Sequence, residues 1–495
     1  MDFSSNSSPA YRSKPLPSLS DPESAKEFKA PGVIRPPDGF NPIEPARERQ
    51  GTGSSPLTHN DLGGVILMRC IDEACPRPKV SGMKRSYLCG FAVAAAIYSS
   101  PSFAADWPRF RGTDGTGVSA ESGWLGNWPG GQPRTVWKSN VGAGFSSVTL
   151  VDGKLFTLGH NGLKANGIDS VVALESSSGK ELWRHSYPEK LADHYYEGGT
   201  SGTPTVDGGR VYTLSKAGVA LCLDAATGKV IWSRNLASEL GLKVPEWGFA
   251  GAPHIAGDRV VYNAGDAGLA LEKATGKEAW MSGKGSAGYG TPVPFSLEGK
   301  PALAIFGLRH VIVIDPVSGR EFWRHLWKTR YDVNAADPVV IGDTMVLTSG
   351  YGTGACGIRF TASGAKEIWK NQALRSHMQA PIGIRGHVYG IDGDGGDAKA
   401  RLKCLEANTG KVVWESPEAE TGVLTAADDK LIWVTGKGEL IIVKADPTGY
   451  HEVVRAQVAR GKVWSTPLLL NGRLYIRNWK GELLCLDVKG SGGVS

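Results

Sequence analysis

The sequence predicts an all-β protein: an eight-bladed β-propeller of four-stranded antiparallel blades, closed by an N-terminal strand. The first observation is a repeat in which an acidic residue, a turn that ends in Gly and a Trp return every 43 to 49 positions. In the clearest copy, Asp224 and Gly228 stand eight and four residues before Trp232. A period of roughly 40 to 50 residues made of short β-rich runs is typical of a radial or stacked repeat protein.

The second observation is the internal pattern of one repeat. Four β-rich runs occupy residues 203–206, 210–214, 219–223 and 229–232, and Gly-containing turns separate them, as in a four-stranded meander. A lone sheet of this kind has exposed edges and two apolar faces, so it must stack on neighbours, and stacking around an axis makes a propeller. We expect a Trp at the end of each outer strand to dock between adjacent sheets. These are Trp137, Trp183, Trp232, Trp280, Trp323, Trp369 and Trp414.

The third observation is the number of repeats, which predicts how the ring closes. The copy around Trp369 is displaced by one residue, and the seventh copy lacks its Trp, so seven blades are the alternative. An outer-strand sequence at residues 134–138 precedes the first repeat, and the eighth repeat stops after its third strand. We therefore predict that residues 134–138 complete the eighth blade. The eight first strands begin near Ser146, Thr203, Ala252, Thr291, Ala336, Ala380, Val423 and Ser465.

The N-terminal part of the chain has a different composition. Residues 1–82 are rich in Ser and Pro without periodicity, which indicates a disordered segment or one upstream of the true start. Residues 83–104 combine a basic start, an apolar run too short to span a membrane and Ser102-Phe103-Ala104, which is the layout of a secretory signal peptide. The alternative is a genuine extension over residues 1–104. We expect a lead-in at 105–133, the propeller at 134–488 and a flexible tail at 489–495, in a protein exported to the periplasm or cell envelope.

Charge and cysteine usage exclude some partners. Residues 1–104 hold 12 Lys and Arg and 10 Asp and Glu, so the remainder carries a formal charge of only +4. This balance predicts no nucleic-acid binding and no membrane binding. Cys222, Cys404 and Cys485 occupy equivalent third-strand positions, too far apart to pair, and Cys356 lies in the fifth repeat. We expect all four to be buried small apolar residues.

The residues 221–232, Leu-Cys-Leu-Asp-Ala-Ala-Thr-Gly-Lys-Val-Ile-Trp, closely resemble the tryptophan-docking repeat of the pyrroloquinoline-quinone (PQQ) propeller superfamily. The resemblance covers residues 134–488, and the opening Asp106-Trp107-Pro108-Arg109-Phe110-Arg111-Gly112 resembles a group of exported PQQ-like propellers. The superfamily includes quinoprotein alcohol dehydrogenases, which use PQQ, calcium and an aspartate base. It also includes the outer-membrane assembly propeller, an interaction scaffold. The vicinal Cys pair of many such dehydrogenases is absent here, and the inter-repeat segments are short.

The segments that enter the innermost strands converge on one mouth of a propeller channel, and here they are polar and aromatic. Flat rings beside carboxylates, an amide and an Arg could hold a planar anionic cofactor such as PQQ or a sugar-like ligand. Glu197, Glu246, Asp332 and Asn334 offer the oxygen ligands that calcium takes. The alternative is that these polar groups are solvated or bonded to one another. The candidate residues are Tyr196, Glu197, Glu246, Trp247, Asp332, Asn334, Arg375, His377, Gln379 and Trp464.

Two functions follow from these expectations. The first is a non-catalytic scaffold whose rim or mouth binds envelope proteins, polymers or other cell-envelope components, with no cofactor. The alternative is a PQQ- and calcium-dependent dehydrogenase of alcohols or sugars. A hydrolase or lyase has only scattered acids and histidines in its favour.

Overall fold

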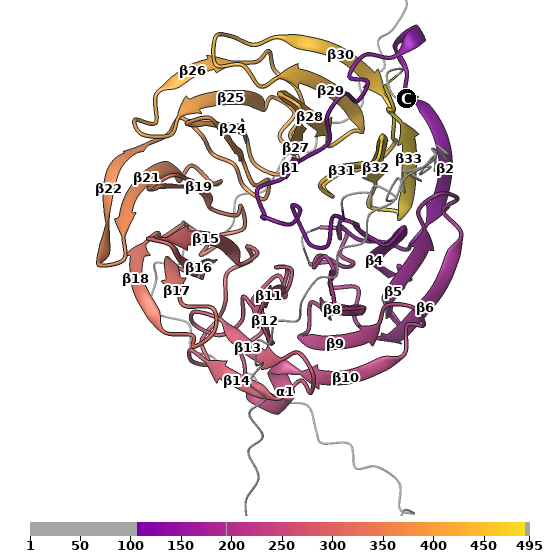
Figure 1. The fold of residues 1–495 in the computed structure, drawn as a ribbon, viewed down its shortest axis with the longest axis vertical. Coiled ribbons are helices and arrows are strands. Elements are labelled where there is room, and N and C mark those ends of the chain that lie inside the picture. The colour runs from indigo at the N-terminus through magenta and orange to yellow at the C-terminus, as the bar shows by residue number, and fades with distance from the viewer. Residues whose placement is uncertain (1–105, 195, 491–495) are drawn as a thin grey trace, which may run out of the picture. The chain divides into compact units, whose positions relative to one another are not determined.

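The repeats fold into eight four-stranded antiparallel sheets arranged around an axis, as Figure 1 shows. The computed structural model describes residues 106–194 and 196–490. The predicted signal peptide, residues 1–82 and the end of the tail lie outside the described residues. Each predicted first strand begins within three residues of its expected position. The eight-bladed architecture is therefore confirmed, and the seven-bladed alternative is wrong.

The strands of blades 1 to 4 follow chain order. Blade 1 contains β3 (Thr149–Val151), β4 (Lys154–His160), β5 (Ile168–Glu175) and β6 (Glu181–Pro188). Blade 2 contains β7 (Thr205–Asp207), β8 (Arg210–Leu214), β9 (Val219–Asp224) and β10 (Val230–Asn235), followed by the short helix α1 (Leu236–Leu240). Blade 3 contains β11 (His254–Ala256), β12 (Arg259–Tyr262), β13 (Leu269–Glu272) and β14 (Glu278–Met281). Blade 4 contains β15 (Val293–Leu297), β16 (Lys300–Phe306), β17 (His310–Ile314) and β18 (Glu321–Leu326).

Blades 5 to 7 repeat this order. Blade 5 contains β19 (Val339–Ile341), β20 (Thr344–Ser349), β21 (Gly354–Thr361) and β22 (Gly364–Asn371). Blade 6 contains β23 (Ile382–Ile384), β24 (His387–Asp392), β25 (Arg401–Glu406) and β26 (Val412–Glu415). Blade 7 contains β27 (Gly422–Ala427), β28 (Lys430–Thr435), β29 (Glu439–Lys444) and β30 (Glu452–Gln457), and β1 (Val118–Ser119) joins β27 in parallel.

Blade 8 closes the ring with a strand from the other end of the propeller. It contains β31 (Leu468–Leu470), β32 (Arg473–Arg477) and β33 (Glu482–Asp487), and its outer strand is β2 (Arg134–Asn140), which follows the short 3-10 helix η1 (Pro129–Gly131). The register places Trp137 opposite Cys485, as Trp232 stands opposite Cys222 in blade 2. The predicted closure is confirmed, and it leaves no unpaired outer edge on β33.

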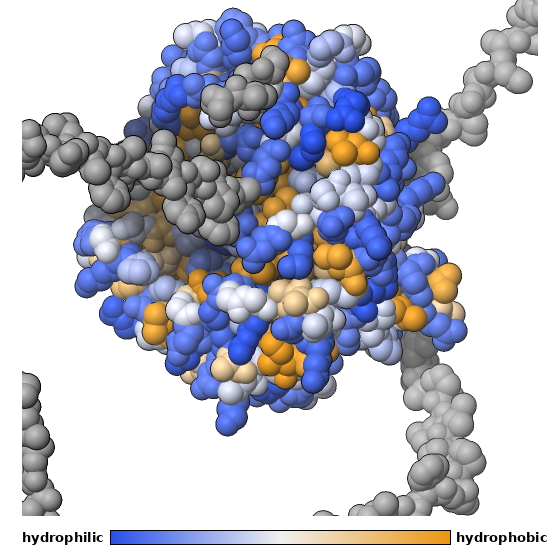
Figure 2. All heavy atoms as spheres, turned by 45° about the vertical axis from the view of Figure 1, so that its right-hand side comes forward, coloured by the Kyte–Doolittle hydropathy of each residue, from blue (hydrophilic) through white to orange (hydrophobic). Residues whose placement is uncertain are grey.

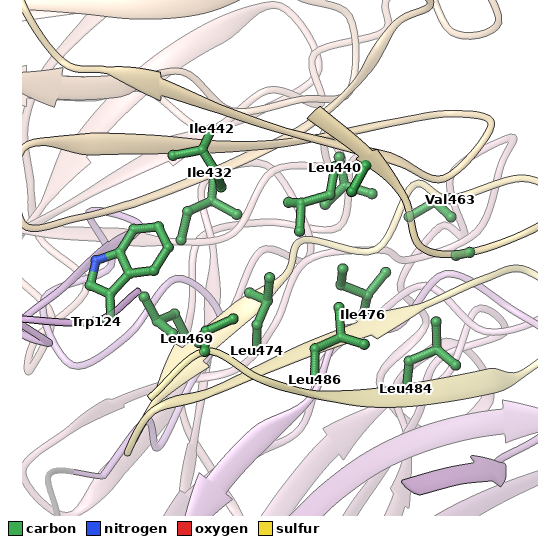
Figure 3. Close-up of a cluster of buried hydrophobic side chains, with 14 of the residues drawn as sticks. Trp124, Ile432, Leu440, Ile442, Val463, Leu469, Leu474, Ile476, Leu484 and Leu486 are labelled. Atoms are coloured by element: carbon green, nitrogen blue, oxygen red, sulfur yellow. The ribbon is translucent and has the colours of Figure 1, made fainter. Parts of the chain in front are cut away.

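The hydrophobic core lies in the seams between blades. The buried apolar side chains form eight clusters, one at each seam. Figure 3 shows the seam between blades 7 and 8, where Ile432, Ile442 and Leu440 face Leu474, Ile476 and Leu484. The face in Figure 2 is mostly hydrophilic with scattered hydrophobic patches, because each blade buries its apolar side chains against its neighbours. The four described cysteines are buried and free, as expected.

The docking Trp residues bridge the seams. The indole of Trp232 donates to the Lys273 carbonyl of the next blade at 2.9 Å, and the ring lies over Gly276. Trp137, Trp183, Trp369 and Trp414 make the same kind of bond to the following blade, at 2.8 to 3.1 Å. Trp280 lies over Gly319 but its Nε1 has no hydrogen-bond partner. Trp323 packs against Phe360, and its Nε1 is also unbonded.

Residues 106–119, which we call the strap, cross the centre of the ring (Figure 1). The Trp107 main chain exchanges hydrogen bonds with Leu150 of blade 1, and Pro108 accepts from Val206 of blade 2. The guanidinium of Arg109 donates to the Pro292 carbonyl before β15, and that of Arg111 donates to Pro381 before β23, at 3.0 and 2.7 Å. Residues 106–119 of the segment predicted as a lead-in therefore pack into the propeller, with Trp107, Arg109 and Arg111 buried.

Candidate binding pocket at the channel mouth

A cavity of about 350 Å³ lies above the strap, where the segments that precede the first strands meet. Its lining includes four of the ten candidate residues, namely Tyr196, Trp247, His377 and Trp464. Further aromatic lining comes from Phe110, Phe145, Tyr289 and Tyr351, and hydroxyl groups come from Ser147, Ser201, Thr203, Thr291 and Thr466. Most blades therefore contribute residues to the pocket, which forms only when the ring is closed.

One wall of the pocket is a continuous row of aromatic rings. The ring of Phe145 lies 5.2 Å from that of Trp464 and 6.0 Å from that of Tyr196, measured between centroids. Tyr196 in turn meets Trp247 edge to face at 6.4 Å. These separations are those of packed aromatic pairs, so each ring holds its neighbour in place. The wall offers a preformed apolar surface.

Two lysines contact the rings of this wall, and neither is among the residues that line the cavity. The Nζ of Lys216 lies 4.4 Å from the centroid of Tyr196, and the side chain is buried. Burial lowers the pKa of Lys216 to about 8, against the opposing effect of Asp169 and Glu189. The Nζ of Lys462 lies 4.3 Å from the Trp464 ring. Both ammonium groups are attracted to the faces of aromatic rings. The lining residues themselves include no positively charged Lys or Arg side chain.

The floor is formed by the strap and by Asp337. Phe110 points into the cavity, and the Asp337 carboxylate accepts from the Thr291 main-chain N–H at 2.7 Å. Desolvation raises the pKa of Asp337, whereas Arg111 and Arg109 lower it. Burial also lowers the pKa of Arg109, to about 10. Neither Arg lines the cavity: Arg111 donates to the carbonyls of Gly115, Thr116 and Pro381, and Arg109 donates to Pro292 from Nη2, whereas its Nε and Nη1 have no hydrogen-bond partner.

His377 is the one lining residue with an imidazole. Its Nδ1 accepts from the Gly395 main-chain N–H at 3.3 Å, and its ring meets Tyr351 edge to face at 4.4 Å. Burial lowers the pKa of His377, against a smaller opposing effect of Asp394. The side chain therefore favours the neutral form and acts as a further flat ring of the lining.

The expected calcium ligands do not converge. Asp332 forms a bidentate ion pair with Arg309 at 2.6 and 2.9 Å, and Glu197 accepts from Lys462 at 2.7 Å. The Asn334 amide is buried and donates to the carbonyls of Gly307, Leu308 and Trp327. Glu246 is exposed and does not line the cavity. Within the described residues no group of three metal-ligating side chains includes these carboxylates.

Arg375 and Gln379 are also placed elsewhere. The Arg375 guanidinium pairs with Asp392 at 2.8 and 2.9 Å, and the Gln379 amide donates to the Thr421 hydroxyl at 3.3 Å. Both side chains thus bond other polar groups of the protein, which was the alternative to a ligand site that the sequence left open. Sequence reasoning missed Phe145, although it stands directly before the first strand like the other candidates. It also missed Phe110 and Tyr351, which no repeat position marks.

The superfamily implies PQQ with calcium, and the lining lacks the groups that these would need. A planar anionic group needs cations or many N–H donors at its carboxylates. Among the described lining residues there is no Lys or Arg, and Asp337 adds an acid. Calcium needs several oxygen ligands at one point, and the expected ones are dispersed. The residues present do not fit PQQ with calcium.

Comparison with known proteins agrees with the fold and the docking pattern. A family model described as "Outer membrane protein assembly factor BamB" matches residues 167–416 and 398–492. The chain belongs to this PQQ-like propeller family. A search of curated proteins by sequence found no match. None of the described helices of this PQQ-like propeller has the length and apolar character needed to cross a membrane.

Solved structures of two functional kinds share the architecture. BamB from Moraxella catarrhalis aligns with a TM-score of 0.54 and 15% identity, over 73% of this chain and 99% of that one. Quinohemoprotein alcohol dehydrogenase from Comamonas testosteroni aligns with a TM-score of 0.57 and 15% identity, over 79% and 81%. A europium-containing methanol dehydrogenase aligns with a TM-score of 0.51 and 13% identity, over 75% and 89%. At these identities the likeness shows the fold alone.

Proposed function

We propose that this PQQ-like propeller is a non-catalytic binding protein of the cell envelope. Its mouth pocket binds a neutral ring-shaped group, for which a sugar ring of an envelope polymer is the best match. The observation that carries the proposal is the lining, whose described residues include seven Phe, Tyr and Trp, five Ser and Thr, and no Lys or Arg. An apolar wall with a few polar groups is the usual composition of a small-ligand site.

The chemistry of a sugar ring matches this lining. One face of a pyranose carries C–H groups that pack on aromatic rings, and its hydroxyl groups exchange hydrogen bonds with Ser, Thr and carboxyl side chains. The row from Trp464 through Phe145 to Tyr196 supplies the apolar face, and Asp337 with Thr291 supplies polar atoms on the floor. A cavity of about 350 Å³ accommodates one or two such rings.

Two features of the sequence support a location in the cell envelope. The signal-peptide pattern of residues 83–104 and the resemblance to exported propellers both support it. Membership of the BamB family supports a role in interaction, not in turnover. We propose that neither PQQ nor Ca²⁺ takes part, because the lining offers an anionic cofactor no Lys or Arg and the expected oxygen donors do not line the cavity.

The test uses the chain expressed through its own export signal and neutral oligosaccharides as probes. Calorimetry should give saturable binding for at least one oligosaccharide of an envelope polymer. Trp464→Ala and Trp247→Ala should each weaken that binding about tenfold, which corresponds to about 1.4 kcal/mol of lost stacking. Glu246→Ala is the matched control, because this exposed residue neighbours Trp247 outside the lining.

Two results would contradict the proposal. One is saturable binding of PQQ with Ca²⁺ together with dye-linked oxidation of an alcohol or sugar, which would establish the dehydrogenase. The other is oligosaccharide binding that persists unchanged in both Trp variants, which would place the ligand outside this pocket.

A further inference from the structure

The seam between blades 4 and 5 departs from the docking pattern of the ring. At three other seams, those between blades 2 and 3, 5 and 6, and 8 and 1, the residue two positions after the docking Trp bonds the turn Gly of the next blade. The Arg234 guanidinium donates to the Gly276 carbonyl at 2.7 Å, the Asn371 amide donates to Gly410 at 2.9 Å, and the Ser139 hydroxyl donates to Gly179. In blade 4 this position is His325, so the equivalent bond would reach into blade 5.

Blade 5 cannot accept that bond, because its repeat is displaced by one residue. Gly364 stands five residues before Trp369, and a Cβ on it would meet no atom within 4 Å, so no Trp lies over it. The buried Nε1 of Trp323 and Nε2 of His325 have no hydrogen-bond partner. This seam therefore has neither of the two polar bonds that join blades 5 and 6.

Three metal-ligating side chains gather at this point instead. The ligand atoms of His325 on β18, Cys356 on β21 and Glu367 on β22 all lie within 4.8 Å of one another. His325 Nε2 and a Glu367 carboxylate oxygen are 3.5 Å apart, too far for a good hydrogen bond. That separation is close to the roughly 3.4 Å expected between N and O ligands about 2.0 Å from one tetrahedral ion.

Cys356 also differs from the other buried cysteines. Cys222, Cys404 and Cys485 each stand directly across from a Tyr on the second strand of the blade. Cys356 stands across from Leu347 and approaches Glu367. Its thiol therefore faces a carboxylate where its counterparts face a hydroxyl group.

We propose that His325, Cys356 and Glu367 bind one thiophilic divalent cation, with Zn²⁺ the best match, as a bridge between blades 4 and 5. Sulfur, nitrogen and oxygen ligands together suit Zn²⁺ better than Ca²⁺ or Mg²⁺. The Cys356 proton leaves to solvent when the thiolate binds, and water takes the fourth position. The Glu367 side chain is 37% exposed and that of His325 is 19% exposed, so the ion enters from the outer rim.

Two neighbouring features shape the affinity. Burial, and secondarily the charge of Glu367, raise the pKa of the Cys356 thiol to about 12, so binding must displace a firmly held proton and should weaken in acid. Burial lowers the pKa of His325, Glu367 opposes this effect, and the nearby Lys370 adds to the lowering. Lys370 also opposes a cation, although its Nζ lies 4.9 Å from the Trp327 ring. The site is on the rim, so it is independent of the pocket at the channel mouth.

The experiment titrates metal-free full chain with Co²⁺, which reports thiolate ligation as a near-ultraviolet charge-transfer band, and then displaces it with Zn²⁺. We expect one Co²⁺ per chain with the thiolate band, and a Zn²⁺-dependent rise in Tm. Cys356→Ser should abolish the band. Glu367→Gln should keep the band and weaken binding about 10- to 100-fold. Cys404→Ser, a buried third-strand cysteine paired with Tyr389, is the matched control and should change neither.

Several outcomes would overturn the proposal. These are no Co²⁺ binding, a spectrum without the thiolate band, or a band that survives in Cys356→Ser. If Cys356→Ser does not fold, the partly exposed Glu367→Gln and His325→Asn decide, and unchanged affinity in both would overturn the site.

Discussion

At the scale of single residues, the turn Gly of five repeats, at positions 179, 228, 276, 319 and 410, serves two purposes. Gly276 adopts φ +70°, which favours Gly, as the turn position predicts. A Cβ at this position would also lie 2.7 Å from the Trp232 ring of the preceding blade. The spacing of four residues between Gly and Trp therefore reflects contact between blades as well as the geometry of one turn.

We predict that Gly276→Ala lowers the free energy of unfolding more than Gly257→Ala does. Gly257 also has a positive φ, +61°, but a Cβ on it would meet nothing within 4 Å. Gly257→Ala should cost about 1 kcal/mol for the backbone conformation alone. Gly276→Ala should cost a further 1 to 3 kcal/mol, roughly, because it displaces a docked Trp. Denaturant unfolding measures both, and equal losses would contradict the docking role of Gly276.

At the scale of elements, one strand decides whether the ring is closed. β2 supplies the outer strand of blade 8 and carries Trp137, whose Nε1 donates to the Ser176 carbonyl of blade 1 at 3.0 Å. Without it, β33 would expose a row of unpaired N–H and C=O groups. The seam between blades 8 and 1 would also lose part of its apolar cluster. Closure thus depends on a segment of seven residues.

We predict that deletion of residues 131–140 lowers stability by at least about 3 kcal/mol, the usual cost of removing a buried Trp, and promotes association through β33. Thermal melting and size-exclusion chromatography measure the two effects. A synthetic peptide of residues 131–140 added in trans should restore the monomer, and a scrambled peptide should not. A deletion variant that melts like the parent and stays monomeric would exclude closure by β2.

At the scale of the whole molecule, the strap connects blades that are distant around the ring. It bonds the inner strands of blades 1 and 2, the segments that lead into blades 4 and 6, and β27 of blade 7. The Ser119 hydroxyl then donates to Leu469 of blade 8 at 2.8 Å. Because the strap bonds several blades at once, the closed ring resists opening at any single seam. The strap also brings the charged Arg109 and Arg111 into the interior of the ring, and this makes the free energy of unfolding depend on pH.

His254 of blade 3 supplies a test of that dependence. Burial, together with the charge of Arg109 on the strap, lowers the pKa of His254 to about 3. The unfolded chain binds this proton near pH 6.5, whereas the folded protein resists it. The free energy of unfolding should therefore fall as the pH drops from about 6.5 toward 3, because protons favour the unfolded state.

We predict that His254→Gln reduces this acid sensitivity. The difference in unfolding free energy between pH 7 and pH 4 should shrink by on the order of 3 kcal/mol. Denaturant unfolding at a series of pH values measures it, with the exposed His451→Gln as the control. Equal acid sensitivity in His254→Gln and the parent would show that His254 is not the responsible group.

The sequence by itself was sufficient for the architecture. The blade count, the first strands, the closing strand and the docking Trp positions all follow from local signals, because each blade repeats the same turns and the same apolar alternation. Tyr196, Trp247, His377 and Trp464 were also predictable as mouth residues, since they stand directly before first strands. The positions of the neighbouring polar side chains were not predictable, because a carboxylate or amide bonds the partner that the folded chain places nearest to it.

Only the tertiary structure decided what occupies the axis and what meets at the seams. Arg109 bonds a carbonyl 183 residues away, and Arg111 bonds one 270 residues away. His325 meets Cys356 and Glu367 only because one repeat is displaced and two blades stack. The repeat pattern of the sequence predicts the strands and turns within each blade. Contacts across the axis and between blades depend on positions that the closed ring sets, and no local pattern encodes them.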